Sequence, residues 1–211
     1  MNRFDGDNFQ SLCDYLCDID DDLKFIIQKY GYPPMWTREN SFSTLILTIL
    51  EQQVSLASAF AAFKRLKEKL PIITPQALLQ LSEEELRQCS FSRQKIMYAR
   101  GLANALVNEQ INLQQFEFEE DEVIRQTLKK LKGIGDWTTD IYMIHALRRL
   151  DIFPVGDLAL VNAIKEIKGL PSATVRHDLL MIAEPWVPYR SIATMIFWHF
   201  YIQKRKLKVP L

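Results

Sequence analysis

Apolar residues recur at three- and four-residue intervals along almost all of this 211-residue chain, and strict alternation of apolar and polar residues is rare. Such spacing places apolar side chains on one face of an α-helix, where they can pack against other helices. The stretch FEFE at residues 116–119 alternates, but it is too short to indicate a strand. We therefore expect an all-α fold of roughly ten helices.

Breakers and capping residues divide this pattern into separate helices. Residues 9–30 are predicted to be helical with an interruption near an acidic run, and residues 31–36, GYPPMW, to form a linker. N-capping side chains and a proline at the first helical position mark several helix starts. These starts are Ser41, Thr74 before Pro75, Ser82 with Glu85, and Ser92. Later helices are expected over residues 120–131, from Asp136 to about Leu150, from Asp157, and in two further segments, the last over about 188–206.

The balance of charge and the number of cysteines argue against several broad classes of protein. Lys and Arg total 26, as do Asp and Glu, so the net charge is zero, which is unlike a protein that binds nucleic acid by its overall charge. Three cysteines do not suggest a disulfide framework. No apolar run reaches the roughly 18 residues that a membrane span requires. We expect a cytoplasmic protein without membrane contact.

Two glycines, Gly133 and Gly135, interrupt the long apolar pattern of residues 131–147. One interpretation is structural: Gly133 adopts the left-handed conformation that ends a helix, and Gly135 allows close packing. The other is a helix-hairpin-helix, in which the N–H groups of the turn and the positive end of the second helix bind a phosphate. Such a site would grip a nucleic-acid backbone without reading its sequence. Asp136 would then have to point away from the phosphate.

A second motif follows, where Asp157 comes after Pro154 and Gly156 and begins a helix. By itself such an Asp is a common N-cap. A glycine hairpin, one helix, and then a Pro/Gly loop that presents an Asp together resemble the helix-hairpin-helix Gly/Pro-Asp superfamily of DNA base-excision glycosylases. The resemblance implies that Asp157 is the catalytic residue.

Three further segments extend this resemblance from about residue 20 to about residue 205. Residues 45–59 are similar to the helix and loop that precede the DNA-wedging residue of the family, and residues 91–106 to its mid-domain helix. Residues 183–200 are similar to the closing segment of bacterial 3-methyladenine DNA glycosylase II. The resemblance implies one glycosylase domain over residues 1–211, with two helical lobes around a cleft. Residues 41–150 would form the central lobe and residues 1–40 and 151–211 the other, and Asp157 and Trp137 would face the cleft.

One position distinguishes the subfamilies. Members that also cut the DNA strand carry a Lys two residues after the second glycine of the hairpin, and its amine attacks the sugar. Trp137 occupies that position here, so the resemblance implies base release alone. No cysteine follows Cys89, which argues against the iron–sulfur cluster of other members. We expect no cofactor beyond a monovalent cation that the hairpin carbonyls could bind, and no other metal.

A glycosylase flips its target base out of the duplex and fills the gap that remains. The resemblance places Gln53, or its neighbour Gln52, at the wedge, where close relatives have an apolar residue. The alternative for both is a polar helix end whose side chains hydrogen-bond to the backbone. The resemblance also implies that the hairpin contacts DNA through Gly133, Ile134, Gly135 and Thr138.

The chemistry of an alkylated purine explains why one carboxylate could suffice, although most glycosidases use two. The base is already cationic and leaves as a neutral molecule. Asp157, at a helix N-terminus that favours an ionised carboxylate, would stabilise the cationic sugar or orient water. Electron-rich rings hold a cationic base, and Trp137 and Trp198 match aromatic pocket residues of the bacterial enzyme. Another pocket aromatic falls on Ile141, beside Tyr142. For each Trp, core packing is the alternative.

Three functions compete. The first is a monofunctional glycosylase, acting as a monomer on damaged double-stranded DNA, that releases alkylated purines such as 3-methyladenine. The second is release of another damaged base on the same scaffold, and the third is a non-catalytic helix-hairpin-helix module that binds DNA or a protein. Asp157 in its Pro/Gly context argues against the third. The aromatic residues, with one carboxylate and no Lys, favour the first over the second.

Overall fold

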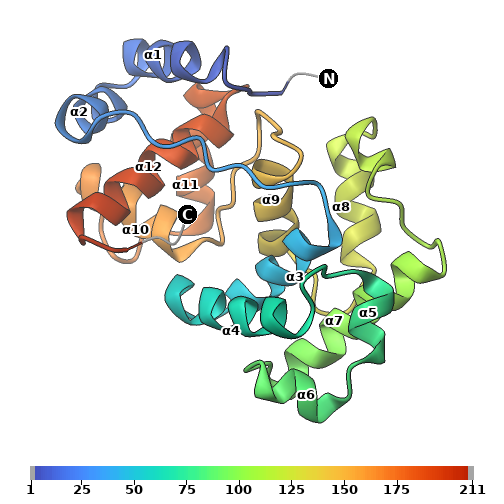
Figure 1. Ribbon diagram of the computed structural model, residues 1–211. Helices are drawn as coiled ribbons and strands as arrows, with labels where there is room; N and C mark the ends of the chain where they lie inside the picture. Colours follow the sequence, from blue (N-terminus) through green and yellow to red (C-terminus); the bar gives the residue numbers. More distant parts are fainter. Residues whose placement is uncertain (1–2, 209–211) are drawn as a thin grey trace. The chain divides into compact units, whose positions relative to one another are not determined.

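The computed structural model describes residues 3–208 and is built from helices (Figure 1). Twelve α-helices and two short 3-10 helices succeed one another along these residues. Within the same range, β-type pairing is limited to an isolated bridge between Arg3 and Arg149. The predicted all-α class is therefore confirmed. In this part of the chain, no helix combines the length and the apolar character that crossing a membrane requires.

The chain divides into two compact units. The terminal unit comprises the residues up to Thr37 together with Met143–Lys208, and the central unit comprises Arg38–Tyr142. The boundary between them falls inside α9 (Asp136–His145). The other helices of the terminal unit are α1 (Phe9–Ile19), α2 (Asp21–Tyr30), α10 (Leu158–Ile167), α11 (Arg176–Ala183), η2 (Glu184–Trp186) and α12 (Arg190–Lys204). Those of the central unit are α3 (Phe42–Glu51), α4 (Leu56–Lys69), α5 (Pro75–Gln80), α6 (Glu83–Gln88), α7 (Arg93–Val107), η1 (Gln115–Glu117) and α8 (Asp121–Lys129).

Local capping chemistry sets most of the helix starts. Side-chain oxygens of N-cap residues accept a hydrogen bond from the backbone N–H three residues later, which satisfies a donor that has no partner within the helix. This occurs at Ser41, Thr74, Ser82 and Ser92, as predicted, and Ser82 forms the expected capping box with Glu85. The interruption expected within residues 9–30 is Asp20, whose carboxylate caps α2.

One helix ends earlier than predicted. The segment expected to be helical from Asp136 to about Leu150 stops at His145. Arg148 adopts a left-handed conformation, with φ 55°, and the Arg149 N–H donates to the Met143 carbonyl at 3.0 Å. The apolar pattern continues past this point although the backbone turns, so periodicity alone overestimates the length of α9.

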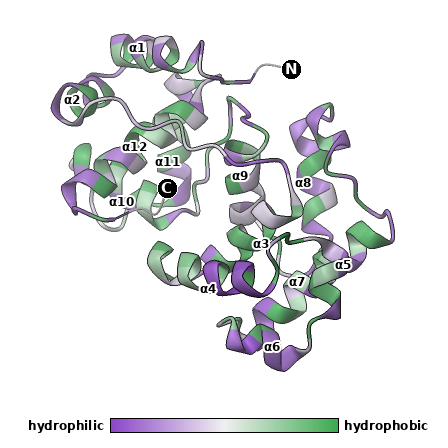
Figure 2. Ribbon diagram, in the orientation of Figure 1, coloured by the Kyte–Doolittle hydropathy of each residue, from purple (hydrophilic) through white to green (hydrophobic). Residues whose placement is uncertain are grey.

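Each unit has its own apolar core around one almost completely buried helix. In the terminal unit, residues 191–200 of α12 are all buried, and this helix packs against α1, α2 and α10. In the central unit, α3 is buried from Phe42 to Glu51 except at Ser43, and it packs against α4 and α7. Hydrophilic and hydrophobic residues alternate around peripheral helices such as α1 (Figure 2). These amphipathic helices cover the two cores.

Candidate functional site

The two glycines of the hairpin differ in what they do. Gly133 has φ +87°, and a Cβ at this position would lie 2.1 Å from the ring of Tyr98. Both the left-handed backbone and the aromatic neighbour therefore require glycine at 133. A Cβ at Gly135 would meet no atom within 4 Å among the described residues. Packing within the protein accounts for the first glycine and leaves the second unexplained.

Helix α9 begins directly after this turn. The Thr139 N–H donates to the Gly135 carbonyl at 3.1 Å, which is an i to i−4 bond at the start of the helix. The N–H groups of a first helical turn have no intrahelical acceptor and lie at the positive end of the helix dipole. Ile134 and Thr138 are buried, so they support the turn from inside. The hairpin thus has the geometry of a backbone anion site.

Asp136 introduces a negative charge into this turn, but two basic residues of α8 neutralise it. Its Oδ1 lies 2.7 Å from Lys129 Nζ and 3.3 Å from Arg125 Nη1. The hydrogen bond from Lys129 lowers the pKa of Asp136, with a smaller contribution from Arg125. Arg125 also pairs with Asp140 of α9 at 2.5 Å. These ion pairs join the two helices of the hairpin and direct the Asp136 carboxylate towards α8.

The loop between α3 and α4 is tied to the hairpin by one glutamine. Gln52 Nε2 donates to the Gly133 carbonyl at 2.9 Å and to Thr138 Oγ1 at 2.8 Å. Gln53, the next residue, is exposed and has φ 58°. Gln52 therefore has the backbone-bonding role that was the alternative interpretation for this pair. Gln53 is exposed in the loop, and its role as the wedge stays a prediction.

Two apolar side chains in and directly after the loop between α3 and α4 were not identified as candidate site residues from the sequence. Val54 is 47% exposed and Leu56, the first residue of α4, is 38% exposed. In the sequence they look like part of a helical apolar pattern. Only the observed helix end at Glu51 places them at a loop and a helix start.

Asp157 is held at the N-terminus of α10 by two donors. Its Oδ1 accepts from the Leu160 N–H at 2.8 Å and from Trp198 Nε1–H at 2.9 Å. The first bond is the predicted N-cap, and the second comes from the middle of α12. The half-buried carboxylate is therefore oriented by both a backbone and a side-chain group.

Trp198 is almost fully buried, and a histidine stacks against its ring. Only 8% of the surface of Trp198 is exposed. The His145 ring stacks on it with centroids 5.4 Å apart and an interplanar angle of 15°. His145 Nδ1 lies 2.8 Å from the carbonyl oxygen of Trp36. His145 could not be identified as a site residue from the sequence, because nothing in the sequence indicates a stacking partner 53 residues from Trp198.

The remaining predicted pocket residues lie in the central unit. Trp137 is half-buried in the first turn of α9, and Ile141 is buried. Tyr142 is fully buried: its hydroxyl donates to Asn40 Oδ1, and its ring packs edge-on against Phe116, with centroids 6.4 Å apart. The structure thus brings Asp157 and Trp198 together. That Asp157 and Trp137 face a common cleft stays a prediction.

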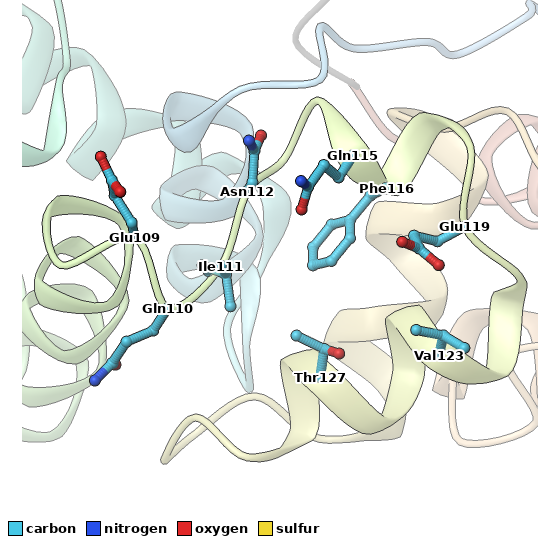
Figure 3. A pocket seen from close by; sticks show the side chains of 9 residues that line it. All are labelled: Glu109, Gln110, Ile111, Asn112, Gln115, Phe116, Glu119, Val123 and Thr127. Carbon is cyan, nitrogen blue, oxygen red and sulfur yellow. The ribbon is translucent and has the colours of Figure 1, made fainter.

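A pocket of about 200 Å³ lies elsewhere in the central unit, near η1 and α8 (Figure 3). Glu109, Phe116, Glu119 and Val123 are among its lining residues, and none of the predicted site residues is. Within residues 3–208 there is also no cluster of three or more His, Cys, Asp or Glu side chains arranged to hold a metal ion.

The chain is similar in sequence to known proteins, two of which come from the same yeast. An alkylbase DNA glycosidase-like protein of Schizosaccharomyces pombe is 34% identical over 134 residues, which are 63% of this chain and 63% of that protein. DNA-3-methyladenine glycosylase 1 of the same yeast is 28% identical over 193 residues, 87% of this chain and 84% of its own length. The chain spans a little under two thirds of the first of these relatives.

A solved structure is similar over almost the full length of both chains. The 3-methyladenine DNA glycosylase of Schizosaccharomyces pombe in complex with abasic DNA matches with a TM-score of 0.83 and 26% identity, over 95% of this chain and 99% of that one. The family model for HhH-GPD superfamily base excision DNA repair proteins matches residues 46–186, which include the hairpin and Asp157. This chain therefore belongs to the HhH-GPD superfamily of base excision DNA repair proteins.

Proposed function

We propose that this protein is a monofunctional DNA glycosylase, which hydrolyses the N-glycosidic bond of alkylated purines such as 3-methyladenine in double-stranded DNA. The observation that carries the proposal is the Asp157 carboxylate, held at the start of α10 by Leu160 and Trp198. An ordinary N-cap needs only the first of these two bonds. A second donor, taken from another helix, indicates that the orientation of the carboxylate matters.

In the proposed reaction, the bond between the base nitrogen and the sugar carbon breaks, and both bonding electrons leave with the base. An alkylated purine carries a positive charge, so these electrons neutralise it and no acid is needed. The sugar becomes cationic, and the negative charge of Asp157 stabilises it electrostatically. Water then adds to the sugar and loses a proton. One carboxylate therefore suffices for this class of substrate.

Binding to DNA would use the turn between α8 and α9. Its backbone N–H groups and the start of α9 suit a phosphate oxygen, and Gly135 leaves space for close approach. The hairpin carbonyls would hold any monovalent cation bound here, which would supply positive charge for a phosphate. The Gly133 carbonyl accepts one hydrogen bond from Gln52, and a carbonyl oxygen has a second acceptor site for such an ion. Contacts of this kind do not depend on DNA sequence.

Release of the base without strand cleavage follows from Trp137. This residue stands where strand-cutting members of the superfamily have a Lys, and an indole cannot form a Schiff base with the sugar. The electron-rich ring would instead attract a cationic base, an interaction of about 0.5–2 kcal/mol. Two Schizosaccharomyces pombe relatives support this substrate class: one is named an alkylbase DNA glycosidase-like protein and the other DNA-3-methyladenine glycosylase 1.

The test uses methylated duplex DNA, with separate duplexes that contain uracil, hypoxanthine or an oxidised purine. After incubation, half of each sample is treated with alkali, and released bases are separated by chromatography. The proposal expects 3-methyladenine in the supernatant and strand cuts only after alkali. Cuts without alkali would show lyase activity. Release of a base only from one of the other duplexes would show that the enzyme acts on a different damaged base. No release from any duplex would favour a DNA-binding module without catalytic activity.

A further inference from the structure

We propose that Trp198 is a positioning residue for Asp157 and that His145 holds the Trp198 ring in place. In this arrangement Trp198 acts on the carboxylate through its N–H group and is not a stacking surface for the flipped base. The inference rests on the proposed glycosylase function and deepens it. Each of the residues involved belongs to the terminal unit, and they come from separate segments of the chain.

The two hydrogen bonds to Asp157 fix the orientation of its carboxylate as well as the position of Oδ1. The Leu160 N–H and the Trp198 Nε1–H approach Asp157 Oδ1 from different helices, at 2.8 and 2.9 Å. One hydrogen bond leaves a carboxylate able to rotate about its side-chain torsions, whereas two donors from different directions restrict that rotation. Charge-assisted bonds of this type are the stronger ones. The carboxylate is therefore oriented before a substrate binds.

The direction of the Trp198 N–H depends on the plane of its ring, and His145 sets that plane. The two rings are 15° from parallel, with centroids 5.4 Å apart. His145 is itself anchored, because its Nδ1 lies 2.8 Å from the Trp36 carbonyl oxygen. A carbonyl oxygen only accepts hydrogen bonds, so Nδ1 of His145 is the donor. The contacts run from the backbone of Trp36 through His145 and Trp198 to Asp157.

The same contacts argue against stacking of a base on Trp198. The His145 ring stacks, laterally displaced, on one side of the Trp198 ring, and only 8% of Trp198 is exposed. A cation–π platform needs an open ring face within about 6 Å of the cation. The N–H edge of the ring is committed to the carboxylate. What the geometry supplies is a rigid hydrogen-bond donor.

Trp198→Phe separates the two roles, because it keeps an aromatic ring against His145 and removes only the N–H group. We expect the single-turnover rate of base release to fall on the order of tenfold to a hundredfold, which corresponds to one hydrogen bond to a charged group. The apparent Kd of the variant for the damaged duplex should stay within about twofold of the wild-type value, because the substitution affects the reaction step and not the binding of the duplex. A base-stacking role predicts the opposite: Phe would still stack, and the rate would be kept.

Trp186→Phe is the matched control. Trp186 is fully buried in the same unit, and its Nε1–H donates to Asp20 Oδ2 at 2.9 Å. This substitution removes an equivalent indole–carboxylate bond away from Asp157. It should lower thermal stability but leave the rate of base release unchanged. Equal loss of rate in Trp186→Phe and Trp198→Phe would reduce the role of Trp198 to general stability and overturn the inference.

The role of His145 has its own pair of variants. His145→Ala removes the stacked ring and should slow base release, whereas His145→Phe restores a ring and should recover most of the rate. His177→Ala, at an exposed histidine of α11, serves as the neutral control. Equal rates for the Ala and Phe variants at 145 would contradict the proposed stacking role.

A measurement without substrate keeps the inference separate from the proposed function. The chain has four tryptophans, so the indole N–H signal that disappears in Trp198→Phe can be assigned in a nitrogen–proton correlation spectrum. That signal should shift in Asp157→Asn and hold its position in Trp186→Phe. If the wild type releases no base, the proposed function fails whatever the spectrum gives. If the wild type is active and Trp198→Phe keeps its full rate, only the inference fails.

Discussion

The ring of Tyr98 lies over Gly133 so closely that a Cβ on this glycine would be 2.1 Å from the ring. Tyr98 comes from α7, and Gly133 is the left-handed residue of the turn before α9. The structural interpretation of the glycine pair therefore accounts for Gly133. The space beside Gly135 fits the second interpretation, in which the turn approaches a phosphate.

We predict that Gly133→Ala destabilises the protein by roughly 2–4 kcal/mol, because it adds a left-handed alanine and a clash with Tyr98. Gly135→Ala should change the free energy of unfolding by less than about 0.5 kcal/mol, since its Cβ would meet no neighbour. Gly135→Ala should nevertheless weaken DNA binding severalfold. Urea unfolding and fluorescence anisotropy with a labelled duplex measure the two effects. Equal stability of both variants would contradict this division of roles.

Gln52→Ala should destabilise the central unit by about 1–3 kcal/mol, because it removes two hydrogen bonds and leaves the buried Thr138 hydroxyl with one partner fewer. Gln53→Ala, at the exposed neighbouring position, should cost less than about 0.5 kcal/mol. Thermal and urea unfolding of the two variants provide the comparison. A loss of stability in Gln52→Ala that is no larger than the loss in Gln53→Ala would contradict the stabilising role of the bonds from Gln52 to the hairpin.

The ion pair between Asp136 and Lys129 predicts a specific dependence of stability on pH. The folded-state pKa of Asp136 is lowered, so its stabilisation is complete above the unfolded pKa of about 3.9 and is lost as the pH falls through the folded pKa. Asp136→Asn should therefore be less stable than wild type at pH 7, by no more than about 1 kcal/mol for so exposed a pair. The difference should shrink as the pH falls towards 3.

Urea unfolding at a series of pH values checks this prediction. Lys129→Met is the partner variant, and the effects of the two substitutions should not add, because each removes the same ion pair. A difference between wild type and Asp136→Asn that stays constant from pH 7 to pH 3 would assign the effect to something other than the ionised carboxylate.

The fold class and most helix starts could be predicted because they depend on local features. Ser41, Ser82 and Asp157 cap helices through bonds to residues three positions away, and such bonds follow from the sequence itself. The end of α9 could not be predicted, because Arg148 takes up a left-handed conformation that its residue type does not indicate.

The candidate site was predictable only in part, for a related reason. Asp157 and the hairpin glycines are carried by short motifs, so their positions could be found in the sequence. The bonds from Gln52 to Gly133 and from Trp198 to Asp157 join residues 81 and 41 positions apart. The apolar periodicity predicts the buried face of α12. It does not indicate that the indole N–H of Trp198 donates a hydrogen bond to a carboxylate.

The most direct test of the central claim is the rate at which Asp157→Asn releases 3-methyladenine from methylated duplex DNA. Asn is nearly isosteric with Asp and can still accept the Leu160 N–H, so the variant should fold with a circular dichroism spectrum like that of wild type. It should also keep its affinity for the duplex. We predict a fall in the single-turnover rate of at least about a hundredfold, because the charge that stabilises the cationic sugar is gone. An unchanged rate in a folded, DNA-binding Asp157→Asn protein would contradict the assignment of Asp157 as the catalytic residue.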